Sequence, residues 1–141
     1  MNAAWAVAVA AIFVWLGMVL AISFLEAPLK FRAPGITLQL GLGIGRLVFR
    51  ALNICETILG LAVLVALFVA VPPTPVVAAV LVAVCALVVQ VLVIRPRLTR
   101  RSDAVLAGAD GPRSRGHYAY VGFEAIKAVA LLVSGILLLT S

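Results

Sequence analysis

The chain has 141 residues, of which 65% are hydrophobic and only 11% charged, and its mean hydropathy is +1.27. A soluble globular domain is about half apolar and a quarter charged, so this composition excludes an ordinary soluble domain and favours a membrane protein. The net charge of +6 would suggest nucleic acid as a partner of a soluble protein. Here the basic residues flank apolar segments, so we expect contact with anionic lipids of the bilayer and no nucleic acid.

Largely apolar segments follow one another along the chain. Because a helix of about 20 apolar residues crosses a hydrocarbon core about 30 Å thick, each segment is long enough to span a bilayer. The sequence therefore predicts an all-α fold, a four-helix transmembrane bundle that forms a single integral membrane domain over residues 1–141. The predicted helices cover residues 3–25, 47–71, 75–94 and 118–140, and the charged connections cover residues 26–46 and 95–117.

The first segment, residues 3–25, differs from a cleaved secretory signal peptide. It follows no basic residue, and it is longer than the apolar stretch of about 7–15 residues that a signal peptide carries. At its end Glu26 and Lys30 are four residues apart, and Pro28 between them disturbs a regular helix. We interpret Glu26 as one half of an interfacial ion pair with Lys30, and a gate or a ligand contact as the alternative.

The connection at residues 26–46 combines cations with glycines and apolar residues. Gly41, Gly43 and Gly45 precede Arg46, just before the predicted second helix. Backbone N–H groups at a helix start can bind phosphate, so this connection is a candidate site for an anion or a lipid headgroup. The alternative is a flexible glycine turn beside ordinary membrane anchors. The candidate lipid- or anion-binding residues are Lys30, Arg32 and Arg46.

The eleven Lys and Arg residues are unevenly distributed, and ten of them lie in or beside the two charged connections. The turn at residues 72–75 and the C-terminal end carry no charged side chain. Because cytoplasmic connections are enriched in Lys and Arg, we predict that both charged connections face the cytoplasm and that both termini lie outside (N-out, C-out). This pattern is typical of a multi-pass protein of a bacterial plasma membrane.

The charged and amide side chains inside the predicted helices all lie toward the predicted cytoplasmic side. At a rise of about 1.5 Å per residue, Glu56 lies roughly 14 Å from the start of the second helix, and Glu124 and Lys127 lie roughly 9 and 14 Å from the start of the fourth. A charge inside a membrane usually has a partner or a function. The candidate ligand or ion-pair cluster, which includes a histidine at the helix edge, is Arg50, Asn53, Glu56, Gln90, His117, Glu124 and Lys127.

Helical spacing places these residues on stripes. His117, Glu124 and Lys127 share one face of the fourth helix. The predicted inward stripe of the second helix, flanked by Glu56, consists of Arg46, Arg50, Asn53, Thr57 and Gly60. Lipid would leave such groups unpaired, so we expect the stripes to face each other. Matching depth predicts the pairs Glu124–Arg50 and Glu56–Lys127, and Glu124 can also pair with Lys127 within its own helix.

Two interpretations of this cluster stay open. Two acids opposite two bases neutralise each other, so the cluster could serve only to fix the register of the helices. Alternatively, it lines an inward-opening polar cavity that holds a small molecule, an ion or a lipid headgroup. A proton relay through Glu56 or Glu124 is one form of the second interpretation.

The sequence contains no recognisable catalytic set, and we expect no metal site and no cofactor. His117 is the only histidine, and we expect it at the membrane interface, with Tyr118 and Tyr120, as part of an aromatic belt. Cys55 and Cys85 lie in apolar segments and form no CxxC motif. This placement is typical of small packing residues rather than of thiolate chemistry.

Several different short motifs are distributed over most of the chain. Residues 24–31 (FLEAPLKF) precede residues 45–53 (GRLVFRALN), and residues 95–97 (RPR) precede an HYxYxxxExxK pattern at residues 117–127. In these motifs the chain resembles a bacterial family of small four-helix integral membrane proteins of unknown function, which are related to eukaryotic transmembrane-protein families of uncertain biochemistry. The resemblance implies a four-helix membrane fold and no established reaction.

We therefore expect a non-enzymatic membrane protein whose cytoplasm-facing polar cluster binds a small molecule, an ion or a lipid headgroup. A mass of 14.7 kDa makes a thin bundle, so we expect a homo-oligomer or an accessory subunit of a larger membrane complex. The alternative is a small oligomeric transporter or exporter that uses Glu56, Glu124 and Lys127.

Overall fold

The computed structural model of the chain describes residues 1–106 and 115–141, with the backbone alone for residues 101, 102, 105, 106 and 115–117. Every regular element in this described part is a helix. Within this described part, four helical spans are long and apolar enough to cross a membrane: Ala3–Lys30, Leu38–Val69, Thr74–Arg100 and Tyr118–Leu139. The predicted all-α, four-helix transmembrane bundle is confirmed.

The spans are built from α-helices and from two wider π-helical segments, η1 and η2. In chain order the elements are α1 (Ala3–Val19), η1 (Leu20–Glu26), α2 (Ala27–Lys30), α3 (Leu38–Val69), α4 (Thr74–Val89), η2 (Gln90–Ile94), α5 (Arg95–Leu106) and α6 (Arg115–Leu139). The first span therefore runs through α1, η1 and α2, and the third runs from α4 through η2 into α5.

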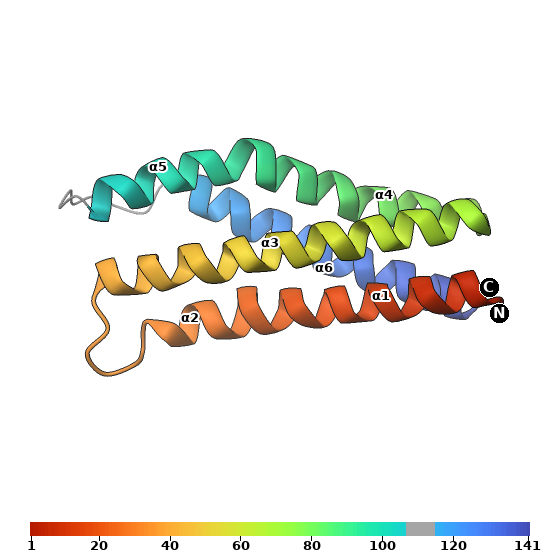
Figure 1. Cartoon of the computed structure of the whole chain (residues 1–141), viewed down its shortest axis with the longest axis horizontal. Helices are drawn as coiled ribbons and strands as arrows, with labels where there is room; N and C mark the ends of the chain where they lie inside the picture. The colour runs from red at the N-terminus through yellow and green to blue at the C-terminus, as the bar shows by residue number, and fades with distance from the viewer. Residues whose placement is uncertain (107–114) are drawn as a thin grey trace.

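The helices lie side by side along one long axis (Figure 1). α1 packs against α3 and α6, and α4 packs mainly against α6. Both chain ends lie at the same end of the bundle as the α3–α4 turn, and we call this the terminal end. The α2–α3 connection and α5 lie at the opposite end, which we call the basic end. Both termini are thus on one side, as an even number of spans requires.

α3 and the third span extend further than predicted. α3 begins at Leu38 rather than near residue 47, because Thr37 caps it: the Leu40 amide donates to Thr37 Oγ1 at 3.0 Å. The third span continues past residue 94 into α5. The prediction of loops over residues 26–46 and 95–117 is therefore wrong for much of their described length. The real connection between the first two spans is the short segment before Thr37.

Each π-helical segment ends two residues before a proline. η1 precedes Pro28 and η2 precedes Pro96. A proline lacks an N–H and its ring clashes with the carbonyl group four residues earlier, so a widened turn accommodates it without ending the helix. The disturbance expected at Pro28 is thus a widened turn, and the helix continues to Lys30. The same two segments contribute Ser23 and Gln90 to the polar interior described below.

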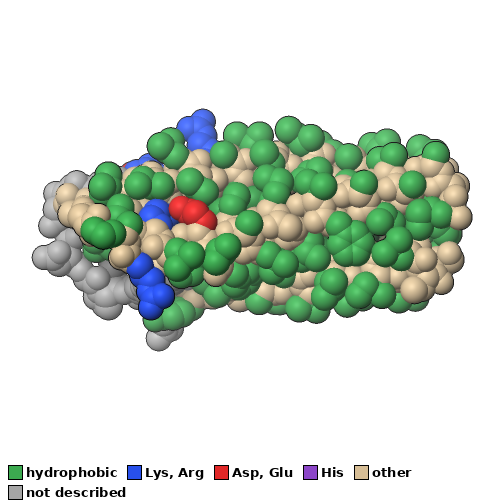
Figure 2. Space-filling view, turned by 90° about the horizontal axis from the view of Figure 1, so that it is seen from below, with side chains coloured by type: hydrophobic (Ala, Val, Ile, Leu, Met, Phe, Trp, Pro, Cys, Tyr) green, Lys and Arg blue, Asp and Glu red, His purple; other side chains and the backbone are tan. Residues whose placement is uncertain are grey.

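The apolar core occupies the terminal half of the bundle. Its fully buried side chains include Ile12, Trp15, Val63 and Leu131. Many outward-facing side chains are also apolar, and Phe68 is 86% exposed. Figure 2 shows hydrophobic side chains over most of one face, with the charged side chains gathered toward the basic end. An apolar core inside an apolar surface is what a bilayer requires of a membrane bundle.

Candidate functional site

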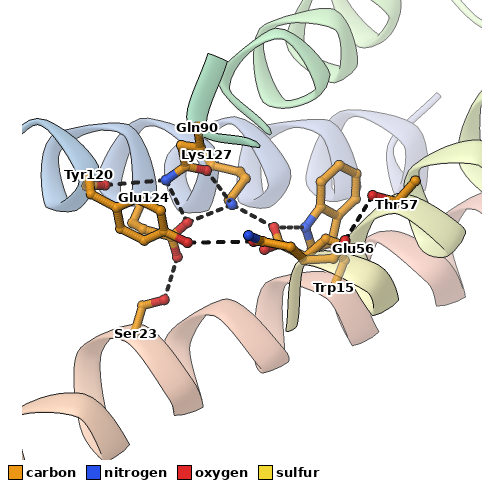
Figure 3. Close-up of polar contacts among 9 residues, drawn as sticks. Trp15, Ser23, Glu56, Thr57, Gln90, Tyr120, Glu124 and Lys127 are labelled. Atoms are coloured by element: carbon orange, nitrogen blue, oxygen red, sulfur yellow. Dashed lines mark hydrogen bonds and ion pairs between the residues drawn. The ribbon is translucent and has the colours of Figure 1, made fainter. Parts of the chain in front are cut away.

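A group of polar side chains lies buried where α1, α3, η2 and α6 meet (Figure 3). At its centre the Lys127 ammonium donates to Glu56 Oε2 at 2.5 Å, to Glu124 Oε1 at 2.6 Å and to Gln90 Oε1 at 2.7 Å. An ammonium has three donors, so each donor of Lys127 has a partner. We call this group the buried ion cluster; its members are Trp15, Ser23, Glu56, Gln90, Glu124 and Lys127.

Further hydrogen bonds satisfy the acceptors of the buried ion cluster. Trp15 Nε1 donates to Glu56 Oε2 at 2.7 Å, and Gln90 Nε2 donates to Glu124 Oε1 at 2.7 Å. The Ser23 hydroxyl donates to the other oxygen of Glu124. Buried charges are tolerated when they are paired and hydrogen-bonded. Because its members come from all four spans, the network fixes the depth of each helix relative to the others.

Asn53 connects the buried ion cluster to Arg95. Its side-chain nitrogen donates to Glu56 Oε1 at 3.2 Å, and its oxygen accepts from Arg95 Nη1 at 2.7 Å. The opposite amide orientation would turn the oxygen toward acceptors and the nitrogen toward donors, so hydrogen bonding selects this one. The Tyr120 hydroxyl lies 3.5 Å from the same amide group, and its ring packs edge-on against Phe49 with centroids 5.5 Å apart.

A cavity of about 460 Å³ lies at the basic end, beside the buried ion cluster. Residues from α2, α3, α5 and α6 and from η1 line it, so the four spans surround it together. Aromatic and aliphatic side chains form its walls, and three cations and one carboxylate face it. We call it the basic-end cavity; its characteristic residues are Ser23, Lys30, Phe31, Arg46, Phe49, Arg95 and Glu124.

Lys30 is the least satisfied charge in the basic-end cavity. Its side chain is only 7% exposed, and its ion pair with Glu26 Oε1 is long, at 3.7 Å. Its ammonium also lies 5.5 Å from the centroid of the Phe31 ring, within the range of a cation–π interaction. Among the described residues, none accepts a hydrogen bond from Lys30, and Glu26 Oε2 is buried without a partner. The N–H donors of Lys30 are therefore available to a ligand in the cavity.

Glycines on α3 make room for α2. A methyl group added at Gly45 would lie 3.2 Å from Lys30 Nζ, and one added at Gly41 would overlap the Phe31 ring. The two glycines are four residues apart and therefore share one face of the helix. A methyl group at Gly43 would meet none of the described atoms within 4 Å. The glycine segment predicted as a turn is therefore a helical face on which Lys30 and Phe31 pack.

The structure brings together most of the candidate cluster. Asn53, Glu56, Gln90, Glu124 and Lys127 meet as described above, and the predicted ion pairs of Lys127 with Glu56 and with Glu124 are confirmed. The predicted pair of Glu26 with Lys30 is also present, at the long distance already given. Gln90 has the central role of bridging the Lys127 ammonium and the Glu124 carboxylate.

The predicted Arg50–Glu124 pair is wrong. Arg50 is exposed, and Glu124 is bonded to Ser23, Gln90 and Lys127 instead. At about 100° per residue, Arg50 lies about 120° around α3 from Glu56, so the two cannot face the interior together. The inward face is centred on Glu56, which sequence spacing had placed only at the flank of its stripe.

Other candidates lie away from the buried ion cluster. Arg32 is exposed, whereas Arg46 lines the basic-end cavity and pairs with Asp103 at 2.6 Å. The side chain of His117 lies outside the described residues. Tyr120 is only 7% exposed, so its predicted place in an aromatic belt at the membrane surface is wrong.

Sequence reasoning missed Trp15, Ser23, Tyr120 and Arg95 as members of the site. Trp15 looked like one more apolar residue, yet its Nε1 donor needs an acceptor when it is buried. That requirement was the available signal, since Glu56 lies on the neighbouring α3. Ser23 could not have been found by regular spacing, because it lies in the widened turn η1.

Comparison of the chain with protein-family models, with curated proteins and with solved structures finds no match in any of the three. The functional assignment therefore depends on the geometry of this chain, and the resemblance drawn from its short motifs stays a prediction.

Proposed function

We propose that this integral membrane protein binds an amphiphilic ligand in the basic-end cavity, with an anionic group of the ligand at Lys30. The observation that carries the proposal is the Lys30 ammonium, which ends a largely buried side chain and donates no hydrogen bond to the described residues. A buried charge without hydrogen bonds is costly. An anionic group in the cavity would remove that cost by accepting from the free N–H donors.

The dimensions and walls of the cavity support an amphiphilic ligand. Its volume of about 460 Å³ lies within the range of about 300–1,000 Å³ that is typical of small-molecule sites. Phe24, Phe31 and Leu42 supply apolar wall, while Arg46 and Arg95 add positive charge near Lys30. An apolar wall beside several cations fits a molecule with a hydrocarbon part and a phosphate or carboxylate group.

Transport across the bundle is less well supported than binding. Beyond the buried ion cluster, the described core at the terminal end consists of apolar side chains such as Ile12 and Leu131. Ser134 lies among them, but its hydroxyl donates to the carbonyl oxygen of Ala130 at 2.6 Å. A charged substrate would find no charged partner along this described core, so we propose a binding protein whose ligand enters from the basic end.

We further propose that the basic end faces the cytoplasm of a bacterial plasma membrane. The cations of both connections support this orientation, because cytoplasmic segments are enriched in Lys and Arg. A cysteine placed at Ser141 should then react with a membrane-impermeant maleimide on intact cells. Reaction only after the cells are opened would show the reverse orientation.

The binding proposal is tested with a defined amphiphile. Purified protein is mixed in detergent with equal amounts of dioleoyl phosphatidic acid and dioleoylglycerol, and native mass spectrometry measures which lipid it retains. We expect the wild type to retain the phosphatidic acid, and Lys30→Met to retain about tenfold less, as the loss of a charge-assisted hydrogen bond implies.

Arg32→Gln is the matched control, since it removes an exposed cation only two residues from Lys30. It should retain phosphatidic acid as the wild type does. Equal retention of the two lipids by the wild type, or equal retention of phosphatidic acid by Lys30→Met, would overturn the proposal.

A further inference from the structure

The basic-end cavity is lined by three cations and, at its inner end, by the carboxylate of Glu124. Lys30 and Arg46 face it from α2 and from the first part of α3, close to the basic end. Glu124 and Ser23 line it at the inner end, next to the buried ion cluster. Ser23, which bonds to Glu124, lies seven residues before Lys30 in the same span, or roughly 10 Å at about 1.5 Å per residue. A single anionic group could therefore satisfy only the outer end.

Glu124 retains unused acceptor capacity on the side of the cavity. Its Oε1 atom accepts from both Lys127 and Gln90, whereas the donor to its Oε2 atom among the described residues is the Ser23 hydroxyl. Each carboxylate oxygen offers about two acceptor positions. One position on Oε2 and the lone pairs of the Ser23 hydroxyl thus remain for a donor from the ligand.

The buried ion cluster also contains more negative than positive charge. Its carboxylates, Glu56 and Glu124, share the single ammonium of Lys127. The next cation, Arg95, reaches the cluster through Asn53, which bonds to Glu56. Of the two carboxylates, Glu124 lines the cavity whereas Glu56 does not, so the uncompensated negative charge meets the cavity at Glu124. A cationic group at that point would balance it.

The geometry points to a zwitterionic ligand for the cavity, a primary ammonium and a phosphate joined by a short linker, with the ammonium at Glu124 and Ser23 and the phosphate at Lys30 and Arg46. This inference rests on the proposed function and names its ligand class. A trimethylated ammonium has no N–H donor for Glu124 Oε2, so the site should reject it. The same chemistry occurs in phospholipid headgroups and in free aminoalkyl phosphates.

The test compares dioleoyl phosphatidylethanolamine with dioleoyl phosphatidylcholine, which share acyl chains, phosphate and net charge. Both are offered together to the purified protein in detergent, and native mass spectrometry measures the ratio retained. We expect the wild type to prefer phosphatidylethanolamine about tenfold, the value of one charge-assisted hydrogen bond. Glu124→Gln should bring this ratio close to one, and circular dichroism with size-exclusion chromatography in detergent should show that the variant is folded.

Ser23→Ala is a milder second variant, and it should lower the ratio several-fold. Equal retention of the two lipids by the wild type would overturn the zwitterion inference, and so would an unchanged ratio in Glu124→Gln, because the preference would then not depend on the Glu124 carboxylate. Failure of the proposed function would give a different result, because the retention of phosphatidic acid would then not depend on Lys30 either.

Competition identifies the source of the zwitterion. Free phosphoethanolamine should displace the retained lipid if the headgroup alone is recognised, and it should have no effect if the hydrocarbon part is required. Free phosphocholine should not displace the lipid, and displacement by it at the same concentration would contradict the inference.

Discussion

The buried ion cluster and the basic-end cavity each contain a buried lysine, but the two lysines differ in how fully they are bonded. Lys127 has three hydrogen bonds of 2.5–2.7 Å from its three donors. Lys30 has a buried side chain and one ion pair at 3.7 Å. Burial of a charge alone therefore does not mark a binding site in this bundle. The fully bonded Lys127 is suited to stabilising the fold, and Lys30 is the lysine that we propose binds a ligand.

The largest expected loss of stability follows substitution of Lys127, the lysine with three hydrogen bonds. Lys127→Met leaves two buried carboxylates without their cation, and loss of one partner of a buried ion pair costs about 3–5 kcal/mol. Denaturant or thermal unfolding in detergent measures the change. Arg50→Met is the control, because it removes an exposed cation and should shift the stability by no more than about 0.5 kcal/mol. Equal shifts in the two variants would show that the buried ion cluster does not stabilise the bundle.

A smaller effect is expected at the indole donors. Trp15→Phe removes the hydrogen bond to the Glu56 carboxylate, and a hydrogen bond to a charged group contributes about 1.5–3 kcal/mol. Trp5 Nε1 donates at the same distance of 2.7 Å to the neutral carbonyl of Ala70. Such a neutral hydrogen bond contributes about 0.5–1.5 kcal/mol to stability. Unfolding measurements should therefore rank Trp15→Phe as the more damaging change. The reverse order would contradict a charged Glu56.

The basic-end cavity can be perturbed without removing a charge. Gly45→Ala places a methyl group 3.2 Å from Lys30 Nζ, so the ammonium must move by a few tenths of an ångström. Retention of phosphatidic acid in native mass spectrometry should fall about two- to fivefold, less than a whole charge-assisted hydrogen bond. Gly43→Ala is the matched control, with open space at its methyl group and a helix propensity gain of up to about 1 kcal/mol. If both variants retain the lipid equally, the position of Lys30 does not matter.

The smallest effect is expected at the surface of the basic end. Arg46 and Asp103 form an ion pair at 2.6 Å, but their side chains are 38% and 59% exposed. Exposed pairs contribute about 0.2–1 kcal/mol, so Asp103→Asn should change the unfolding free energy by no more than that. Raising the salt concentration should reduce even this difference. A loss comparable to that of Lys127→Met would show that α5 is held mainly by this pair.

The fold and the centre of the buried ion cluster could be predicted from the sequence, because both follow from hydropathy and from depth along a helix. Glu56, Glu124 and Lys127 lie at matching depths, and a membrane leaves such charges few partners. The cavity could not be predicted. It depends on the widened turn at Ser23 and on the close packing of Lys30 against Gly45, and neither appears in a regular helical pattern. The glycines that allow this packing looked like a turn.

The error at Arg50 has a related physical cause. Several faces of a helix can each contain a row of polar residues. The face with the most polar residues was predicted to point inward. The structure selects the face that buries Glu56 and Gly60 and leaves Thr57 exposed. Thr57 satisfies its hydroxyl on the carbonyl oxygen of Asn53 at 2.8 Å, so it needs no partner across the bundle.

The contrast between the two lysines is tested most directly by measuring stability and ligand retention on the same delipidated sample of Lys30→Met. The protein should unfold within about 1 kcal/mol of the wild type, since Lys30 has one long ion pair to lose, and it should retain about tenfold less phosphatidic acid. A stability loss like that of Lys127→Met with retention unchanged would show instead that Lys30 belongs to the structural network and that the cavity is not its ligand site.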